Sequence, residues 1–231
     1  TLLEGRVGLI RSHIQDKDRQ FDFARMAGGL GDKWESREIS FKPYPTAHFI
    51  HSFLDAALFL VRNAGLKASD VKTIMCPIAE HMVPIVCEPV HEKIKPDTDW
   101  HGRISLQYSL AEAIQHGRLD GRGYAPESLR NPAILELAKK IGYRVDAKAP
   151  GREQFKGWVI VETNDGRTLE RVEMFNRGSS KLPMSADDIK EKFRDNASFM
   201  LKRDRIEEVV KRVDQLERMM DVRELIALCC Q

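Results

Sequence analysis

Cysteine is scarce in this chain of 231 residues, which contains four of them. Cys76, Cys87, Cys229 and Cys230 include no CxxC pair and do not form the pattern of a disulfide framework. We therefore expect buried free thiols in a reducing compartment, either the cytoplasm or, in a eukaryote, the mitochondrial matrix.

Long apolar runs are also missing. No stretch approaches the roughly 20 residues needed to cross a bilayer, and no signal peptide is recognisable, so we expect no membrane partner. The 37 basic and 35 acidic residues nearly balance, which gives no general reason to expect nucleic acid. The glycine cluster at 28–31 fits neither GxGxxG nor a P-loop and predicts a flexible loop.

The stretch Lys42–Asp55, KPYPTAHFIHSFLD, is the most informative part of the chain. Its two prolines keep the backbone extended, so a helix begins only after Pro45, and Thr46 is a suitable N-cap. Apolar residues then recur at helical spacing at Ile50, Phe53, Leu54, Ala57, Leu58 and Val61. His48, His51 and Asp55 follow a different stripe, which places two imidazoles and a carboxylate on one face of the first turns.

The rest of the chain mixes strand and helix patterns. Apolar and β-branched runs predict strands at Lys33–Lys42, Val71–Pro77, Met82–Cys87, Lys156–Thr163 and Thr168–Met174. Asn164–Arg167 joins the last two as a hairpin turn. Helical spacing, caps and stop signals predict helices at Phe49–Asn63, Ser105–Gly117, Asn131–Gly142, Ala186–Leu201, Arg203–Met220 and from Asp221 onward.

Four stretches, in the same order, resemble the MmgE/PrpD family. They are KPYPTAHFIHSFLDAAL from Lys42, ISLQYSLAEAIQHGRL at Ile104–Leu119, VETNDGRTLERVEM at Val161–Met174 and RGSSKLPMSADDIKEKFRDNA at Arg177–Ala197. The first resembles a K-x-Y-P segment, the third a D-G-R hairpin and the fourth an R-G segment that ends in K-F. Four ordered matches identify the chain as a member of this family.

The resemblance implies an α+β fold. Residues 46–176 would form the smaller α+β domain of the family. Residues 1–45 would be the end of an all-helical domain, and the helices of 177–231 would return to it, while its main part is absent from these 231 residues. The resemblance also implies a homodimer without an organic cofactor.

The site that the resemblance implies lies around Lys42. We predict Lys42, His51 and His81 as catalytic residues, with Lys42 binding a carboxylate and the imidazoles assisting proton transfer. We predict Tyr44, His48, Tyr108 and Arg177 as substrate-binding residues. No metal is expected, because HxxH with Asp55 is not the HExxH pattern.

Ordinary structural roles remain open for several of these side chains. His51 and Asp55 are spaced for a simple polar contact on one helix. Tyr108 could be a buried tyrosine with a satisfied hydroxyl. Arg177 could form a cap or a surface ion pair.

The activity that the resemblance implies is that of a lyase or isomerase acting on a small di- or tricarboxylate. We expect a dehydratase similar to 2-methylcitrate dehydratase, with decarboxylase and epimerase as alternatives. Ala47 stands where decarboxylase-like members have a histidine, and His81 stands where they have a tyrosine, which disfavours the decarboxylase. A non-catalytic dimerisation or binding module is the alternative outside enzymes.

Overall fold

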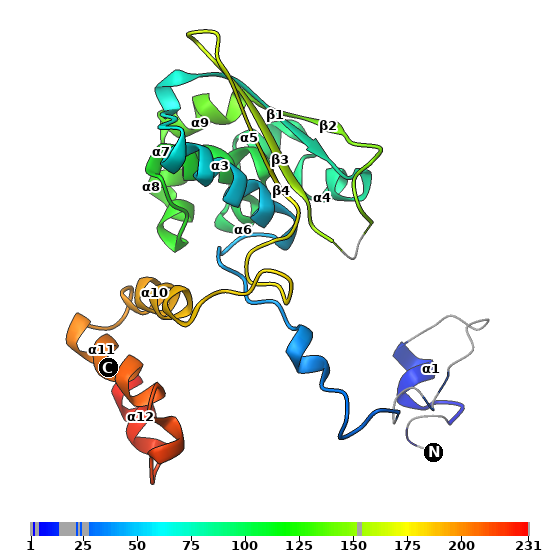
Figure 1. The fold of residues 1–231 in the computed structure, drawn as a ribbon, viewed down its shortest axis with the longest axis vertical. Helices are drawn as coiled ribbons and strands as arrows, with labels where there is room; N and C mark the ends of the chain where they lie inside the picture. The colour runs from blue at the N-terminus through cyan, green and yellow to red at the C-terminus, as the bar shows by residue number, and fades with distance from the viewer. Residues whose placement is uncertain are drawn as a thin grey trace. The chain divides into compact units, whose positions relative to one another are not determined.

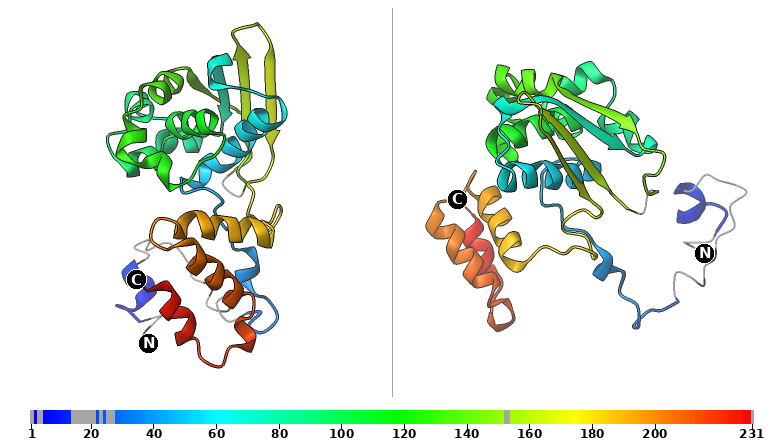
Figure 2. Two further views of the ribbon diagram at one scale, coloured as in Figure 1. Left: turned by 90° about the vertical axis from the view of Figure 1, so that its left-hand side faces the viewer. Right: turned by 45° about the horizontal axis from the view of Figure 1, so that its top comes forward.

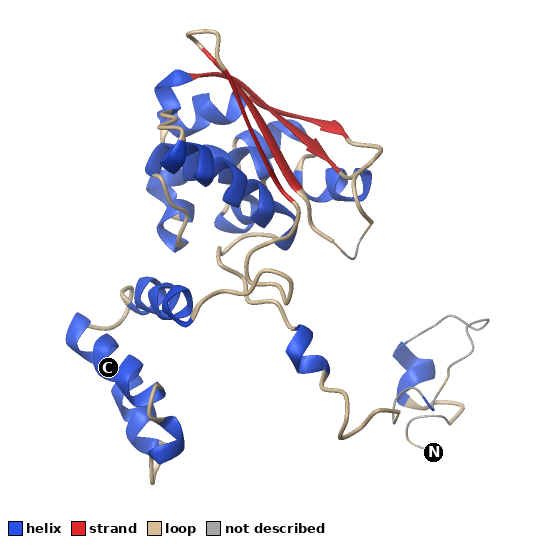
Figure 3. Cartoon of the chain, in the orientation of Figure 1, coloured by secondary structure: helices blue, strands red, loops and turns tan. Residues whose placement is uncertain are grey.

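The structure is a computed structural model that describes residues 2, 5–13, 22, 24, 28–151 and 154–230 (Figures 1 and 3). Residues 1–38 and 39–231 form two compact units. The first unit contains α1 (Leu9–His13) and a 3-10 turn, η1 (Glu35–Glu38). The second unit contains the sheet and the remaining elements, and it holds the candidate site.

The second unit has four strands and a larger set of helices. The strands are β1 (Val71–Ile78), β2 (Ile141–Val145), β3 (Gly157–Thr163) and β4 (Thr168–Glu173). The α-helices are α3 (His51–Asn63), α4 (Val83–Val86), α5 (Val90–Ile94), α6 (Asp99–Arg103), α7 (Leu106–His116), α8 (Pro126–Leu129), α9 (Pro132–Lys139), α10 (Ala186–Ala197), α11 (Arg203–Val213) and α12 (Arg223–Cys229). The 3-10 turns are η2 (His48–Ile50), η3 (Ala68–Asp70), η4 (Glu80–Met82), η5 (Gly121–Tyr124) and η6 (Leu216–Arg218).

The sheet has the strand order β2-β1-β3-β4 and is mixed. β1 pairs with β2 in parallel, so the chain between them crosses over through α4–α9. β1 and β3 are antiparallel, and β3 and β4 form the predicted hairpin. Along β3, buried side chains alternate with more exposed ones, whereas the last three residues of β1 are all buried. Helices α3 and α7 lie on the buried face (Figure 2). The α+β class is therefore confirmed.

Helix α3 is the central helix of this unit, and it packs against β3, β4 and α7. Five of the six apolar positions predicted for its stripe are buried, and Val61 is partly buried against the same core. Gly157 at the start of β3 approaches the helix so closely that an added Cβ would lie 2.2 Å from the carbonyl carbon of Ser52. This close approach sets the distance between α3 and β3.

Several local predictions are confirmed. Ser105 caps α7 by accepting a hydrogen bond from the N–H of Tyr108, and Asn131 caps α9 in the same manner. Ser185 and Asp188 form the predicted capping box at the start of α10. Each of these signals acts over two to four residues, so it does not depend on distant packing.

Two predicted strands are wrong. Around 33–42 the structure has the turn η1, and Trp34, Ile39 and Phe41 are all more than half exposed, so no core stabilises an extended segment there. At 82–87 the chain forms η4 and α4, because Pro84 lies in the first turn of the helix, where its missing N–H has no helical partner to lose.

Three further expectations need correction. Thr46 does not cap the helix, which begins through the turn η2 with Ala47 as N-cap, since the Thr46 hydroxyl donates to the Arg103 carbonyl instead. Strand β2, expected as the end of a helix, forms because residues 141–145 pair with β1. Cys76 and Cys87 are buried as expected, but Cys229 and Cys230 are exposed.

Helices α10, α11 and α12 pack in sequence order, α10 against α11 and α11 against α12. Ile206 and Val209 are the buried residues of α11, and an Arg194–Glu207 pair at 2.8 Å joins it to α10. The all-helical domain to which these helices were assigned is not described here, so the domain limits stay predictions. In the described part of the chain no helix is both long and apolar enough to span a membrane.

The loop at 39–47 is held against the loop at 176–185 by a very close backbone approach. The N–H of Phe41 donates to the Gly178 carbonyl at 2.8 Å. Gly178 has φ +92°, and an added Cβ would lie 1.9 Å from the carbonyl oxygen of Phe41. A side chain at this position therefore requires one of the two loops to move.

We expect Gly178→Ala to destabilise the protein by about 3 kcal/mol or more, through left-handed strain plus this overlap. Gly166→Ala is the matched control, because Gly166 has φ +86° with nothing within 4 Å of an added Cβ, so only the strain of about 1–2 kcal/mol applies. Urea denaturation followed by circular dichroism measures both. Equal losses would mean that the two loops do not meet as described.

Candidate active site

The loop that carries Lys42 is fixed at its far end to Arg103, the last residue of α6. The Ala47 N–H donates to the Arg103 carbonyl at 2.8 Å, and the Thr46 hydroxyl donates to the same oxygen at 2.5 Å. The Arg103 guanidinium in turn donates to the Pro45 carbonyl at 2.9 Å. With Phe41 bonded to Gly178 at the other end, the loop is tied to two separate segments, so the position of Lys42 does not depend on the prolines alone.

The carbonyl oxygen of Thr46 is shared by two predicted site residues. Lys42 Nζ donates to it at 3.3 Å, and His51 Nε2 lies 3.3 Å from it. Because a carbonyl only accepts, the His51 proton is on Nε2 and Nδ1 is an acceptor. Nδ1 is buried and has no hydrogen-bond partner in the described structure. Lys42 and His51 are therefore neighbours, as predicted.

His51 is completely buried, with an exposed fraction of 0%. Its ring lies 5.0 Å from the His48 ring and 5.7 Å from the Tyr44 ring between centroids. Burial, then the neighbouring His48, and more weakly the positive charges of Lys42 and Lys192, lower the pKa of His51 to about 3. The imidazole is thus neutral throughout the physiological pH range.

His48 is half-buried beside it and is oriented by a side chain 128 residues further along the chain. The Asn176 amide donates to His48 Nε2 at 2.7 Å, so the neutral ring carries its proton on Nδ1. Asn176 itself is 5% exposed. Burial and the charge of Lys42 lower the pKa of His48, so this imidazole too is biased toward its neutral form.

A second lysine reaches the same loop from α10. Lys192 Nζ donates to the Lys42 carbonyl at 2.5 Å across 150 residues of sequence. Within the described residues, neither Lys42 nor Lys192 has a carboxylate within 4.0 Å. Two ammonium groups therefore lie at one loop without acidic partners.

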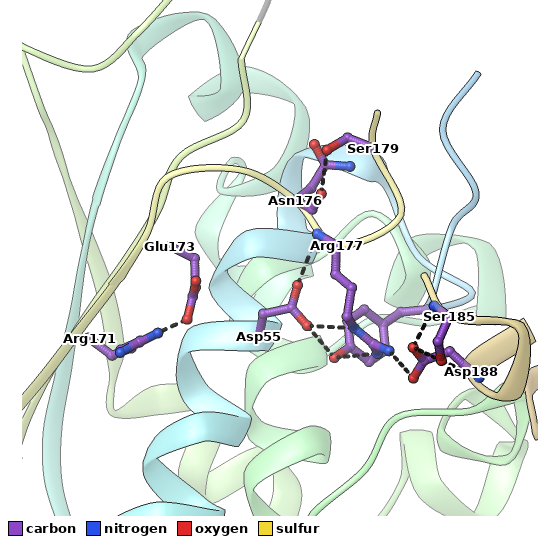
Figure 4. Close-up of polar contacts among 9 residues, drawn as sticks. Asp55, Arg171, Glu173, Asn176, Arg177, Ser179, Ser185 and Asp188 are labelled. Atoms are coloured by element: carbon purple, nitrogen blue, oxygen red, sulfur yellow. Dashed lines mark hydrogen bonds and ion pairs between the residues drawn. The ribbon is translucent and has the colours of Figure 1, made fainter. Parts of the chain in front are cut away.

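Asp55, the acidic residue on the first turns of α3, is bonded to other side chains (Figure 4). The Tyr44 hydroxyl donates to Asp55 Oδ1 at 2.7 Å, and the Arg177 guanidinium lies 3.5 Å from the same oxygen. Arg177 also contacts Asp188 at 3.0 Å and the Tyr44 hydroxyl at 3.4 Å. Tyr44 is buried, and its burial together with Asp55 raises the pKa of the phenol.

This arrangement connects Tyr44 and Arg177 with each other rather than with Lys42. The Arg177 guanidinium lies between the Asp55 and Asp188 carboxylates. It therefore forms an ion pair, which is one of the ordinary structural roles left open for Arg177. The structure does not test whether either side chain also contacts a substrate, so their binding roles stay predictions.

His81 lies further along the same side of the core. Its ring lies 6.2 Å from the Phe49 ring, Phe49 lies 5.4 Å from Phe155, and Phe155 lies 4.8 Å from His48. His81 Nε2 is buried without a hydrogen-bond partner among the described residues. A row of rings thus separates His81 from His48, and its catalytic role stays a prediction.

Tyr108 is placed away from this group. It lies on α7 with 0% exposure, and its hydroxyl donates to the Gly123 carbonyl at 2.7 Å. Its ring packs against Tyr124, 6.1 Å away. The structure brings together Lys42, Tyr44, His48 and His51 and connects Arg177 to them, but it does not bring Tyr108 there.

No metal-ligand set is formed by the residues that the structure describes, since no three His, Cys, Asp or Glu side chains converge. Asp55, which could have joined His48 and His51, is bonded to Tyr44 and Arg177 instead. What remains is a positively charged, imidazole-lined surface whose chemistry suits anions and proton transfer.

Two members of this group were missed from the sequence, Asn176 and Lys192. Both lay close to a signal. Asn176 precedes the R-G motif by one residue, and Lys192 is the lysine of the K-F pair that ends the same matched segment. Nothing in the residues themselves indicated that Asn176 contacts His48 or that Lys192 contacts Lys42.

The fold and the site together define a class of protein. It is an α+β domain with a cationic, imidazole-lined loop at the start of its central helix. The model of the MmgE/PrpD C-terminal domain matches residues 44–216. The chain belongs to the MmgE/PrpD family, and the predicted resemblance is confirmed.

Curated relatives agree with this assignment. The chain is 27% identical to mouse cis-aconitate decarboxylase and 29% identical to the human protein of that name, each over 84% of this chain and 40% of the relative. It is 25% identical to the cis-aconitate decarboxylase-like protein oryM of Aspergillus oryzae, over 90% of this chain and 44% of that protein. The chain therefore spans less than half the length of these relatives.

The lowered pKa of His51 makes stability depend on pH. The unfolded imidazole takes up a proton near pH 6.5 and the folded one only near pH 3, so stability is full above about pH 6.5 and falls as the pH drops toward 3. Between about pH 7.5 and about pH 5 we expect His51 to account for a loss of about 2 kcal/mol. Urea denaturation at both pH values measures it.

His51→Gln should lose this part of the pH dependence while the remainder persists. His91→Gln is the control, because the His91 side chain is 84% exposed, and it should keep the wild-type dependence. A wild-type pH dependence in His51→Gln would contradict the buried, neutral imidazole.

Proposed function

We propose that this protein is an MmgE/PrpD-type lyase acting on a small di- or tricarboxylate by general acid–base chemistry. The observation that carries the proposal is the pair Lys42 and Lys192, which share a loop with two imidazoles and have no described carboxylate within 4.0 Å. Ammonium groups without acidic partners are suited to bind the carboxylates of a substrate. The names of the curated relatives support the same substrate class.

Lys42 is the residue to which we assign carboxylate binding. Its ammonium has three donors, of which the described structure uses one, on the Thr46 carbonyl. Removal of a proton at carbon, or loss of carbon dioxide, leaves negative charge next to a carboxylate, and a fixed ammonium stabilises this charge more strongly than it stabilises the ground state. This makes Lys42 useful for any of the three reactions considered.

The imidazoles divide the remaining work. His51 has no exposed surface, so we propose that it does not touch the substrate. It acts indirectly, by holding the Thr46 carbonyl to which Lys42 is bonded. His48 is half-buried, is neutral at physiological pH and is oriented by Asn176, and so it is the imidazole that we place against substrate. His81, with its unpartnered Nε2, stays the second proton-transfer candidate.

The reaction itself is a finer proposal. We propose a dehydratase similar to 2-methylcitrate dehydratase. The relatives named as cis-aconitate decarboxylases favour the decarboxylase, whereas Ala47 and His81 depart from the decarboxylase-like pattern. Both reactions begin with a polycarboxylate at the same lysine.

Turnover decides between these reactions. The full-length gene product and the 231-residue chain are each incubated with 2-methylcitrate, citrate, cis-aconitate and iminodisuccinate in deuterated water and followed by proton NMR. We expect loss of water from 2-methylcitrate. Carbon dioxide release from cis-aconitate would replace the dehydratase with the decarboxylase, and no conversion of any substrate by the full-length protein would favour a non-catalytic binding module.

Lys42→Ala should lower kcat/KM about 100-fold, because a charge-assisted contact worth about 2–3 kcal/mol is removed from the transition state. Lys72→Ala is the control, since Lys72 lies on β1 and its side chain is 64% exposed. Circular dichroism checks that both variants fold. An unchanged kcat/KM in folded Lys42→Ala would refute the assignment.

The homodimer, and the expected absence of nucleic-acid and membrane partners, stay predictions.

A further inference from the structure

Lys192 is unusual among the basic residues of α10. Its neighbours on the helix are neutralised, since Lys190 pairs with Asp214 at 2.7 Å and Arg194 with Glu207 at 2.8 Å. Lys192 instead donates to the Lys42 carbonyl, and it has no carboxylate within 4.0 Å among the described residues. A partly buried cation without an acidic partner is costly to hold, so its retention next to another lysine needs a reason.

Lys192 faces the positive charge of Lys42, and burial together with this charge lowers the pKa of Lys192. The charge of Lys192 in turn acts on the buried His51 at the start of α3. Asp55 of α3 and Asp188 of α10 are both bound by Arg177. The positive potential at the loop is therefore left for a ligand from outside the chain.

Both ammonium groups keep hydrogen-bond donors that the described part of the structure leaves unused. Lys42 Nζ is bonded to the Thr46 carbonyl, and Lys192 Nζ to the Lys42 carbonyl, so the two cations lie at opposite ends of one five-residue loop. Each ammonium has two donors beyond the bond that the structure shows. Two such groups at the two ends of one loop match a ligand with at least two carboxylates better than they match a monocarboxylate.

We propose that Lys192 is a second carboxylate-binding lysine, which joins Lys42 in a site specific for polycarboxylates. This inference rests on the proposed function and deepens it by naming the group that selects two or more carboxylates. It assigns to α10 a direct role in substrate binding, in addition to its contact with the loop.

A purely structural lysine, which only bonds the Lys42 carbonyl, has to be distinguished from a binding one. Lys192→Gln does this, because its amide still donates a hydrogen bond while the charge is lost. Lys192→Arg restores the charge. Lys190→Gln is the matched control, on the same helix and two residues away, where the lost charge is paired with Asp214.

The probe is tricarballylate, a tricarboxylate without the hydroxyl or double bond that the proposed reactions need, with acetate as the monocarboxylate comparison. Isothermal titration of the full-length protein measures both at low salt. We expect tricarballylate to bind more tightly than acetate, and its Kd to rise about tenfold in Lys192→Gln. The rise should shrink with added salt, should be largely reversed in Lys192→Arg, and should be absent in Lys190→Gln.

The outcomes separate this inference from the proposed function. An unchanged Kd in folded Lys192→Gln, or no binding of tricarballylate by the wild type at about 10 mM, overturns the two-lysine site. If the wild type still turns over a polycarboxylate in the first case, the proposed function survives alone. If tricarballylate binding depends on Lys192 but no substrate is converted, the two-lysine site stands and the lyase does not.

Discussion

The ion pair network of Arg177 is the interaction on which the site depends. The guanidinium binds Asp55 of α3 and Asp188 of α10 and contacts the Tyr44 hydroxyl, and so it joins the central helix, the last helical group and the loop that carries Lys42. It also removes two carboxylates from electrostatic competition. Neither acid forms an ion pair with Lys42 or Lys192 in the part of the chain that the structure describes.

The same separation of charge explains the state of the imidazoles. His51 is buried next to two lysines and a second histidine, and all of these influences oppose protonation except its bond to the Thr46 carbonyl. A neutral ring in this position costs little to bury, whereas an imidazolium there would add a positive charge to an already positive group. Burial and the lysines together therefore keep the His51 imidazole neutral beneath a surface that attracts anions.

How far the sequence predicts this structure depends on the range of the signals. Ser105, Asn131 and the Ser185–Asp188 pair predict helix starts correctly because a cap acts within its own turn. The stripe of α3 is equally local, because its period is set by the helix itself. Strand β2 was missed because residues 141–145 become a strand only by pairing with β1, some 67 residues earlier in register.

The site shows the same limit more sharply. Lys42 and His51 lie nine residues apart and were predicted as neighbours, whereas Lys192 reaches the loop across 150 residues and Asn176 reaches His48 across 128. No periodicity relates such positions, so residue patterns alone could not assemble them. Both were nevertheless within one residue of, or inside, the R-G to K-F segment that carries the family resemblance. The position of Lys192 is therefore better explained by its place in the fold, at the Lys42 carbonyl, than by its own helix.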